Sequence, residues 1–120
     1  MTRPTIAILG ASADRSKYGN RAIHSYRGHG YDVYPVNPKE EQIEGLKSYR
    51  SILDVPVRPD RVSIYLPPAI GIKIIEEVAQ KGAGEVFLNP GSESDELIQK
   101  AEGLGLKVVV ACSITDVESR

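Results

Sequence analysis

Short apolar runs alternate along the chain with segments whose apolar residues recur every three or four positions. The apolar runs occupy residues 5–9, 31–36, 61–66, 85–88 and 107–110, and most are rich in valine and isoleucine. Near-continuous apolar strands of this kind are typical of a parallel sheet that is covered on both faces. The pattern therefore predicts five parallel β-strands.

Helical spacing appears between these runs, in three stripes: Ala22, Ile23 and Tyr26; Ile70, Ile74, Ile75 and Val78; and Leu97, Ile98, Ala101 and Leu104. Glycines follow each stripe, as expected where a helix ends in a left-handed residue. Ser92 or Ser94 is placed to cap the third helix. The stretch from residue 37 to residue 60 is less regular, and we expect a short helix at 48–53, bounded by Pro56 and Pro59.

This alternation of strands and helices predicts an α/β fold. We expect a single Rossmann-like domain over residues 1–120, with right-handed crossovers and helices on both faces of the sheet. The predicted strand order is 3-2-1-4-5, numbered along the chain. Ligands of such sheets bind at the carboxyl ends of the strands, near the switch point beside strand one. Candidate functional residues are therefore those that follow each strand.

The turn after strand one, residues 10–20, has the features of a phosphate-binding corner. Gly10 keeps the turn tight and allows an anion to approach the main chain. Ser12 adds a hydroxyl donor, and Arg15 and Lys17 add positive charge. The turn departs from G-x-G-x-x-G because Ser12 replaces the second glycine. The alternative is a tight turn that only starts a helix.

Strand two ends in Asn37-Pro38-Lys39, where NAD-binding folds usually place an acid that binds the ribose hydroxyls. An acid would repel a phosphate on the ribose, whereas an amide and an ammonium group favour it. The sequence therefore favours a phosphorylated adenosine, either the 2′-phosphate of NADP or the 3′-phosphate of coenzyme A (CoA). The alternative is a simple turn with a solvated lysine.

The ends of strands three and four are rich in proline. Pro67 and Pro68 are expected to form a rigid wall for a ring or an alkyl chain, or only to end the strand and start the next helix. Asn89, Pro90 and Gly91 precede the third helix, where Gly91 permits close approach and the following amides offer a second anion or amide site. The alternative is a capped turn.

Composition excludes several classes of function. The 120 residues contain 15 Lys and Arg against 16 Asp and Glu, a balance that argues against a nucleic-acid partner. Without an apolar leader or an 18-residue apolar run, we expect a cytoplasmic protein that does not contact membranes. His24, His29 and the single cysteine, Cys112, do not have metal-ligand spacing, so no metal is expected. No set of residues suited to acid–base or nucleophilic chemistry is apparent, which predicts a protein that is not an enzyme.

The strand-end residues together resemble a known family, the small stand-alone CoA-binding proteins. Their Rossmann-type domain is similar to the N-terminal domain of the succinyl-CoA synthetase α subunit. The matching pieces are Leu9-Gly10-Ala11-Ser12, Lys17-Tyr18-Gly19-Asn20, Tyr34-Pro35-Val36-Asn37-Pro38-Lys39, Ile43-Glu44-Gly45-Leu46, Tyr49-Arg50-Ser51, Leu66-Pro67-Pro68 and Asn89-Pro90-Gly91-Ser92.

The resemblance implies that the chain binds CoA, with residues 10–18 at the diphosphate: Gly10, Ala11, Ser12, Lys17 and Tyr18. It implies that Asn37, Pro38 and Lys39 lie at the 3′-phosphoadenosine end, and that Leu66, Pro67 and Pro68 line the ligand. Asn89, Pro90 and Gly91 would face the pantetheine or the adenine.

In the synthetase the chemistry belongs to a phosphorylated histidine in a further domain, which we expect to be absent from a chain that stops after strand five. The expected function is non-catalytic binding of CoA or an acyl-CoA, in a homodimer or with a protein partner. The alternatives are an NADP-dependent oxidoreductase and a subunit of a CoA-utilising enzyme whose catalytic residues come from a partner.

Overall fold

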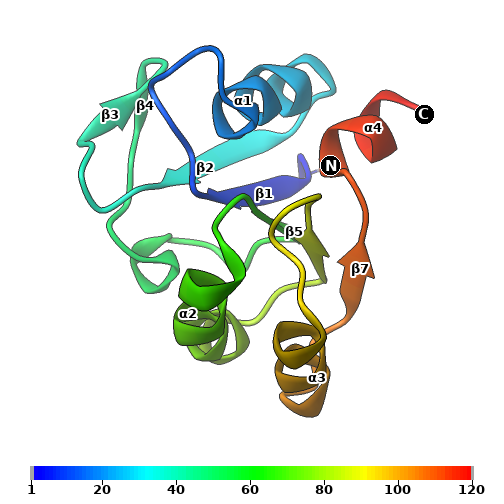
Figure 1. The fold of residues 1–120 in the computed structure, drawn as a ribbon. Helices are drawn as coiled ribbons and strands as arrows, with labels where there is room; N and C mark the ends of the chain where they lie inside the picture. Colours follow the sequence, from blue (N-terminus) through cyan, green and yellow to red (C-terminus); the bar gives the residue numbers. More distant parts are fainter. Residues whose placement is uncertain (1, 120) are drawn as a thin grey trace.

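A parallel sheet forms the centre of the protein, seen here in a computed structural model that describes residues 2–119 (Figure 1). The strands are β1 (Thr5–Leu9), β2 (Asp32–Val36), β5 (Arg61–Ile64), β6 (Glu85–Leu88) and β7 (Val108–Val110). Within the described residues they form one five-stranded sheet in the order β2-β1-β5-β6-β7. The α/β class and the five parallel strands are thus confirmed, and each strand begins or ends within two residues of its predicted bounds.

The predicted strand order is wrong. Numbered along the chain, the five strands lie in the order 2-1-3-4-5, because β5 pairs with β1 on the edge opposite β2. Because crossovers between parallel strands are right-handed, the face of the sheet that a connection covers determines on which side of the previous strand the next strand lies. The connection from β2 to β5 carries the 3-10 helix η1 (Ile52–Asp54) on the face opposite α1 (Tyr18–Gly28), so the chain returns past β1. The switch point consequently lies between β1 and β5.

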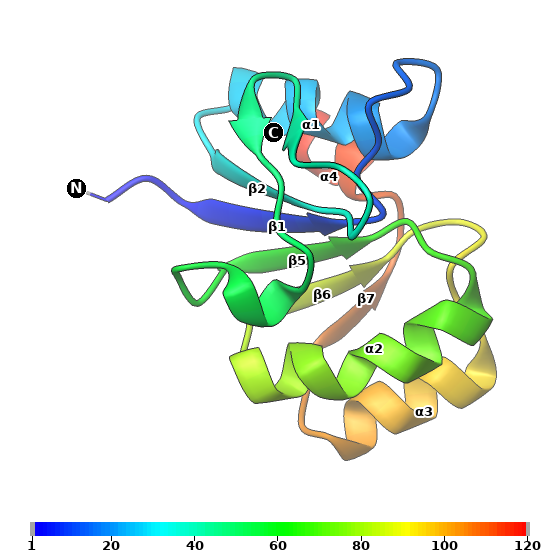
Figure 2. The same cartoon turned by 90° about the vertical axis from the view of Figure 1, so that its left-hand side faces the viewer.

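Helices cover both faces of the sheet, as predicted. Figures 1 and 2 show α1 and α4 (Ser113–Glu118) on one face, and η1, α2 (Pro68–Lys81) and α3 (Asp95–Gly103) on the other. Ser94 is the residue that caps α3, through a hydrogen bond from the Leu97 N–H to its Oγ. No helix in the described part of the chain has the length and apolar character needed to cross a membrane.

A small hairpin of β3 (Gln42–Ile43) and β4 (Leu46–Lys47) precedes η1, so the expected helix at 48–53 is reduced to one turn at Ile52–Asp54. Its two-residue turn has positive φ at both positions, 52° at Glu44 and 77° at Gly45. Two positive φ values fit the type I′ turn that joins tightly paired strands. The hairpin lies on the α1 side of the sheet, where Ile43 is buried against α1.

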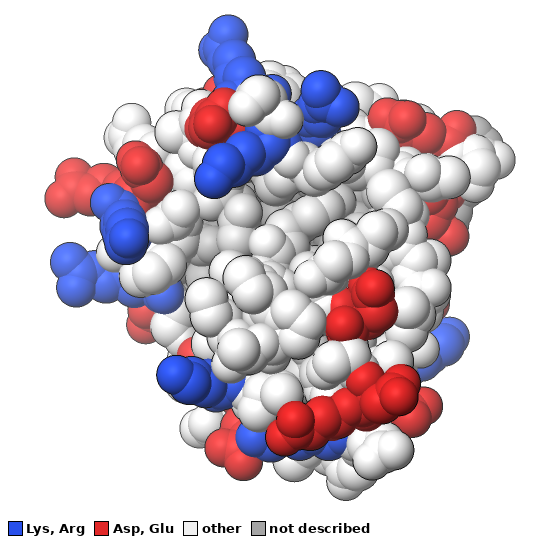
Figure 3. All heavy atoms as spheres, viewed as in Figure 1, with Lys and Arg blue, Asp and Glu red and all other residues white. Residues whose placement is uncertain are grey.

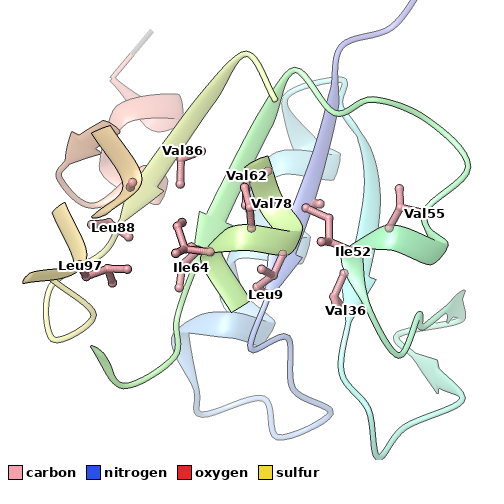
Figure 4. Close-up of a cluster of buried hydrophobic side chains, with 13 residues drawn as sticks. Leu9, Val36, Ile52, Val55, Val62, Ile64, Val78, Val86, Leu88 and Leu97 are labelled. Atoms are coloured by element: carbon pink, nitrogen blue, oxygen red, sulfur yellow. The ribbon is translucent and has the colours of Figure 1, made fainter. Parts of the chain in front are cut away.

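Two apolar clusters hold the layers together. In β1, Ile6 and Ile8 face α1, whereas Ala7 and Leu9 face α2. This alternation follows from the period of two along a strand. Figure 4 shows the larger cluster between the sheet, η1, α2 and α3. Because β1 is buried on both faces, its carboxyl end is rigidly placed at the centre of the sheet.

A buried arginine fixes α4 against the sheet. The Arg61 side chain is only 6% exposed, and its Nη1 donates to Asp116 of α4 at 2.7 Å and to the Tyr26 hydroxyl at 3.2 Å. The Tyr26 hydroxyl in turn donates to the Ser113 carbonyl at 2.8 Å. Burial alone would lower the pKa of Arg61, but the hydrogen bonds to Asp116 and Tyr26 outweigh it and raise the pKa. Arg61 therefore stays charged and holds α4.

Candidate functional site

Three adjoining hollows follow the carboxyl ends of the strands. The β2 hollow, of about 390 Å³, is lined by residues that include Gly10, Asn37, Lys39, Arg50 and Leu66. The central hollow, of about 490 Å³, shares Gly10 and Leu66 with it and adds Lys17, Tyr18, Tyr65, Pro67, Pro90 and Gly91. The α4 hollow, of about 460 Å³, shares Tyr18, Tyr65 and Pro90 with the central hollow and extends to Cys112, Ile114 and Thr115.

The shared residues join the hollows into one groove from β2 to β7. Four strand spacings separate these two strands, a distance of about 19 Å. Figure 3 shows this face of the molecule, with a broad uncharged centre, most of the positive side chains above and to the left, where some negative ones also lie, and most of the other negative side chains on the right and below. The groove therefore suits an elongated ligand that is anionic toward one end.

The β2 hollow combines apolar walls with two cations. Leu66, Ile70 and Ile74 line it, as do Lys39 and Arg50. Within residues 2–119, neither cation lies within salt-bridge distance of a carboxylate. One acid also lines the hollow: Glu77, which accepts a hydrogen bond from Ser51 at 2.9 Å. Apolar walls with cations at the rim can hold a flat ring that carries a phosphate.

Asn37 lies in the β2 hollow, but its side-chain amide is used within the fold. Its Nδ2 donates to the Ala11 carbonyl at 2.8 Å, and its Oδ1 accepts from the Lys39 N–H at 2.8 Å. The amide thus ties the loop after β1 to the loop after β2. Ala11 is buried and contributes its carbonyl to this tie, while Pro38 lines the hollow beside it.

The N-terminus of α1 opens into the central hollow. In the described structure, the backbone N–H groups of Tyr18 and Gly19 have no intramolecular acceptor. Both residues and Lys17 line the hollow. Free N–H groups at a helix N-terminus, with an ammonium group beside them, form a site suited to an anion.

Two glycines permit this geometry. Gly10 has φ +86°, and a Cβ on it would lie 3.0 Å from the main chain of Tyr65. Gly10 is therefore required by the close passage of the loop after β5, a reason that the sequence did not reveal. A Cβ on Gly19 would overlap the Gly10 carbonyl, so Gly19 allows α1 to start directly against the turn.

Ser12 and Arg15, which were expected to bind phosphate, have partners inside the loop. The Ser12 Oγ accepts a hydrogen bond from the Asp14 N–H at 3.0 Å. The Arg15 guanidinium pairs with Glu44 at 3.2 Å. Asn20 links the two, because its Nδ2 donates to the Ser12 carbonyl at 2.9 Å and to Glu44 at 3.1 Å. These groups shape the loop, and neither Ser12 nor Arg15 lines the central hollow.

The prolines after β5 take two positions. Pro67 lines the central hollow, whereas Pro68 is the first residue of α2, as predicted. Leu66 lies at the junction of the β2 and central hollows and forms their shared wall.

The polar groups of the loop after β6 form more hydrogen bonds within the protein than expected. Asn89 is 2% exposed; its Nδ2 donates to Ser63 and to the Ile64 carbonyl, both at 2.9 Å. The Gly91 N–H donates to Glu93 at 3.1 Å. Acidic residues also occupy the first turn of α3, so its N-terminus is much less favourable to an anion than that of α1. Pro90 and Gly91 contribute mainly surface to the central hollow.

Sequence reasoning missed several lining residues. Arg50 belongs to Tyr49-Arg50-Ser51, one of the segments that resemble the CoA-binding proteins, so the sequence contained a reason to include it in the site. Ile70 and Ile74 were assigned to a helical stripe, and half of that stripe in fact faces the β2 hollow. Ile114 and Thr115 belong to α4 and line the α4 hollow. In the sequence this helix is indicated only by Ile114 and Val117, two apolar residues three positions apart after Ser113.

Cys112 lines the α4 hollow and is partly buried. Burial raises the pKa of its thiol, but hydrogen bonds from Thr115 and from the Ile114 N–H outweigh that effect, so the pKa is lowered. Among residues 2–119, no three His, Cys, Asp or Glu side chains are grouped so that they could hold a metal.

Comparison with known proteins gives consistent matches. Residues 4–118 match the family described as CoA binding domain. The α subunit of acetate–CoA ligase (ADP-forming) II from Pyrococcus furiosus is 30% identical over 115 residues, which cover 87% of this chain and 25% of the subunit. Acetate–CoA ligase (ADP-forming) I from Archaeoglobus fulgidus is 32% identical over 114 residues, covering 87% of this chain and 17% of the ligase.

A solved structure of a hypothetical protein from Pyrococcus horikoshii superposes with a TM-score of 0.90 at 34% identity, covering 98% of this chain and 83% of that one. The chain spans about a quarter or less of the length of the curated relatives that it matches. The family match covers nearly the whole chain and agrees with the resemblance in the strand-end residues. The protein belongs to the CoA-binding domain family.

Proposed function

We propose that this protein binds CoA or an acyl-CoA in the groove at the carboxyl ends of its strands, and that it does not itself catalyse a reaction. The observation that carries the proposal is the continuity of the β2 and central hollows. One supplies apolar walls with Lys39 and Arg50, and the other supplies the free N–H groups of Tyr18 and Gly19. This order of groups matches a phosphorylated adenosine joined to a diphosphate.

The proposed assignments follow this order. Lys39 and Arg50 bind the ribose 3′-phosphate, and the adenine packs between Leu66, Ile70 and Ile74. The diphosphate lies at the N-terminus of α1, with Gly10 giving it access to the main chain and Lys17 adding charge. Asn37, Ala11 and Ser12 act indirectly by shaping the two loops. The pantetheine then follows Tyr18, Pro67, Pro90 and Gly91.

The absence of catalysis is proposed from the chemistry of the lining residues. Among residues 2–119, no histidine lines the three hollows, and the carboxylates that line them, Glu77 and Glu118, lie in different hollows. General acid–base chemistry needs such groups at the reacting atoms.

A second candidate function follows from the relatives. The relative from P. furiosus is named as the α subunit of a ligase, and this chain matches a quarter of it. The protein would then present CoA to a partner that supplies the catalytic residues. NADP binding is a further alternative, which the same experiment addresses.

The test is a panel of ligands. The purified protein is denatured and any released adenine compound is identified by mass spectrometry; the melting temperature is then measured with CoA, dephospho-CoA, NADP and NAD. A ligand at 100 times its Kd adds about 2.7 kcal/mol to the free energy of unfolding. We expect CoA to raise the melting temperature most. A larger shift with NADP would replace the proposal with the oxidoreductase alternative, and no shift with any of the four would reject nucleotide binding.

A further inference from the structure

The α4 hollow continues the groove from the central hollow toward β7. It shares Tyr18, Tyr65 and Pro90 with the central hollow, and lies at the end of the groove away from Lys39 and Arg50. A CoA molecule whose adenosine occupies the β2 hollow must direct its sulfur toward this end. The α4 hollow is thus next to the sulfur and has about 460 Å³ of space, within the range of small-molecule sites.

The floor of the α4 hollow is polar but already satisfied. The Asn89 Oδ1 accepts from the Ser113 N–H at 2.8 Å, and the Ser113 Oγ bonds to Ser63 at 2.7 Å and to the Tyr65 hydroxyl at 3.1 Å. Within the described residues no buried side-chain nitrogen or oxygen lacks a partner. The floor therefore offers no unpaired group to a charged ligand.

The walls and rim favour a neutral occupant. Pro90, Ile114 and the rings of Tyr18 and Tyr65 supply apolar surface. Arg21 and Glu118 also line the hollow, and their opposite charges offset each other; the Arg21 guanidinium lies 5.3 Å from the centre of the Tyr18 ring. A terminal carboxylate placed here would lose water without meeting a net positive charge, which costs free energy.

We propose that the α4 hollow is an acyl site, which makes the preferred ligand a CoA thioester with a short, uncharged acyl chain. This inference rests on the proposed function, because it assumes that the adenosine end of CoA lies in the β2 hollow. It assigns the recognition of the acyl group to α4 and to the start of α1.

The experiment compares CoA, butyryl-CoA and succinyl-CoA by calorimetry. The two thioesters have the same four-carbon chain and differ in whether it ends in a methyl group or a carboxylate. Each fully buried methylene contributes about fourfold in affinity. The three apolar carbons of butyryl are only partly buried in an open hollow, so we expect butyryl-CoA to bind at least about tenfold more tightly than CoA and than succinyl-CoA.

Two variants of α4 locate the effect. Thr115 is exposed and lines the hollow, so Thr115→Trp fills the space without disturbing the core. Ser119 is exposed next to the same helix and does not line the hollow, so Ser119→Trp is the control. We expect Thr115→Trp to abolish the preference for butyryl-CoA while the Kd for CoA changes by less than about twofold. The control, Ser119→Trp, should bind all three ligands as the wild-type protein does.

The outcomes separate the two proposals. If CoA and both thioesters fail to bind the unchanged protein, the proposed function is wrong, and this inference is wrong with it. If CoA binds but butyryl-CoA is no tighter, or its preference survives Thr115→Trp, the acyl site is rejected and the CoA site stands. Tighter binding of succinyl-CoA than of butyryl-CoA would also reject the neutral acyl site, and would assign Arg21 as a carboxylate ligand instead.

Discussion

Glu44 has a backbone conformation that residues with a side chain rarely adopt. Its φ of 52° lies in the left-handed region, at a cost of about 1–3 kcal/mol. Its side chain is 10% exposed, and its carboxylate accepts hydrogen bonds from Asn20 and Arg15. The His24 Nε2 lies 3.1 Å from the Glu44 Oε1. Since Asn20 also holds the Ser12 carbonyl, Glu44 connects the hairpin to the loop after β1. The strained turn is thus offset by contacts that shape the proposed diphosphate site.

The charge on Glu44 predicts a pH dependence of stability. Its hydrogen bonds with Asn20 and Arg15 hold its pKa below the ordinary value of 4.5. Because the pKa of Glu44 is lower in the folded state than in the unfolded state, its charge stabilises the fold. The stabilisation is complete at pH values above the pKa of the unfolded state, and it is lost as the pH falls through the pKa of the folded state. We expect Glu44→Gln to lower the melting temperature by a few degrees at pH 7, and the difference to shrink as the pH falls from about 5 to about 3.

Glu41 supplies the control, because it lies exposed before the same hairpin and its side chain has no hydrogen bond or ion pair within residues 2–119. Glu41→Gln should leave the melting temperature unchanged across this range. A Glu44→Gln difference that stays constant between pH 7 and pH 3 would show that the carboxylate charge does not contribute.

At the level of elements, α4 is short and depends on tertiary contacts. Six residues cannot form a stable helix alone, so α4 exists because Val117 is buried and Arg61 holds Asp116. The same helix provides one wall of the α4 hollow. The stability of this wall therefore depends on Arg61, at the amino end of the central strand β5.

We predict that Arg61→Met lowers the free energy of unfolding by about 2–4 kcal/mol, because removing one partner leaves partly buried carboxylates uncompensated. Denaturant unfolding measures the loss, and hydrogen exchange should show that protection falls first in α4. The control is Lys107→Met: Lys107 also pairs with Glu85 but is largely exposed, so we expect a loss of about 0–1 kcal/mol. Equal losses in the two variants, or unchanged protection of α4, would contradict this account of Arg61.

The elements also show how much the sequence can predict. All five strands and the three long helices were predicted, because the strands are near-continuous apolar runs and each helix has a clear apolar period followed by glycines. The β3–β4 hairpin has strands of two residues, too short for a period, and α4 has a single pair of apolar residues three apart. The strand order depends on which face of the sheet η1 covers. That face is determined by the packing of Ile52 and Val55 against the sheet, which the sequence alone does not show.

The sequence predicts which residues follow each strand and so lie near the candidate site. It does not predict which of their side chains point into the groove. Gly10, Lys17, Lys39, Leu66 and Pro67 line the groove as the topology requires. By contrast, Ser12, Asn37 and Asn89 direct their polar groups into the fold. A sequence shows that an amide follows a strand, but the partner of that amide lies on another loop.

For the whole molecule, the charge distribution matters more than the net charge. The net charge is −1, yet on the face shown in Figure 3 most cations lie above and to the left, with some acids among them, and most of the other acids lie on the right and below. The cationic side adjoins the loops after β1 and β2, and the acidic side adjoins α3. This asymmetry supports an orientation for the ligand, with its phosphates toward β2 and its neutral end toward β7.

Calorimetric titration of CoA and dephospho-CoA into the unchanged protein, Lys39→Glu and Lys47→Glu tests this orientation most directly. The two ligands differ only in the ribose 3′-phosphate, and Lys47 is an exposed cation of β4 that does not line the β2 hollow. We predict that Lys39→Glu weakens CoA by about tenfold or more, equivalent to about 1.4 kcal/mol, and changes dephospho-CoA by less than about twofold, while Lys47→Glu changes neither. Equal weakening of both ligands by Lys39→Glu, or none, would contradict the placement of the phosphorylated ribose beside β2.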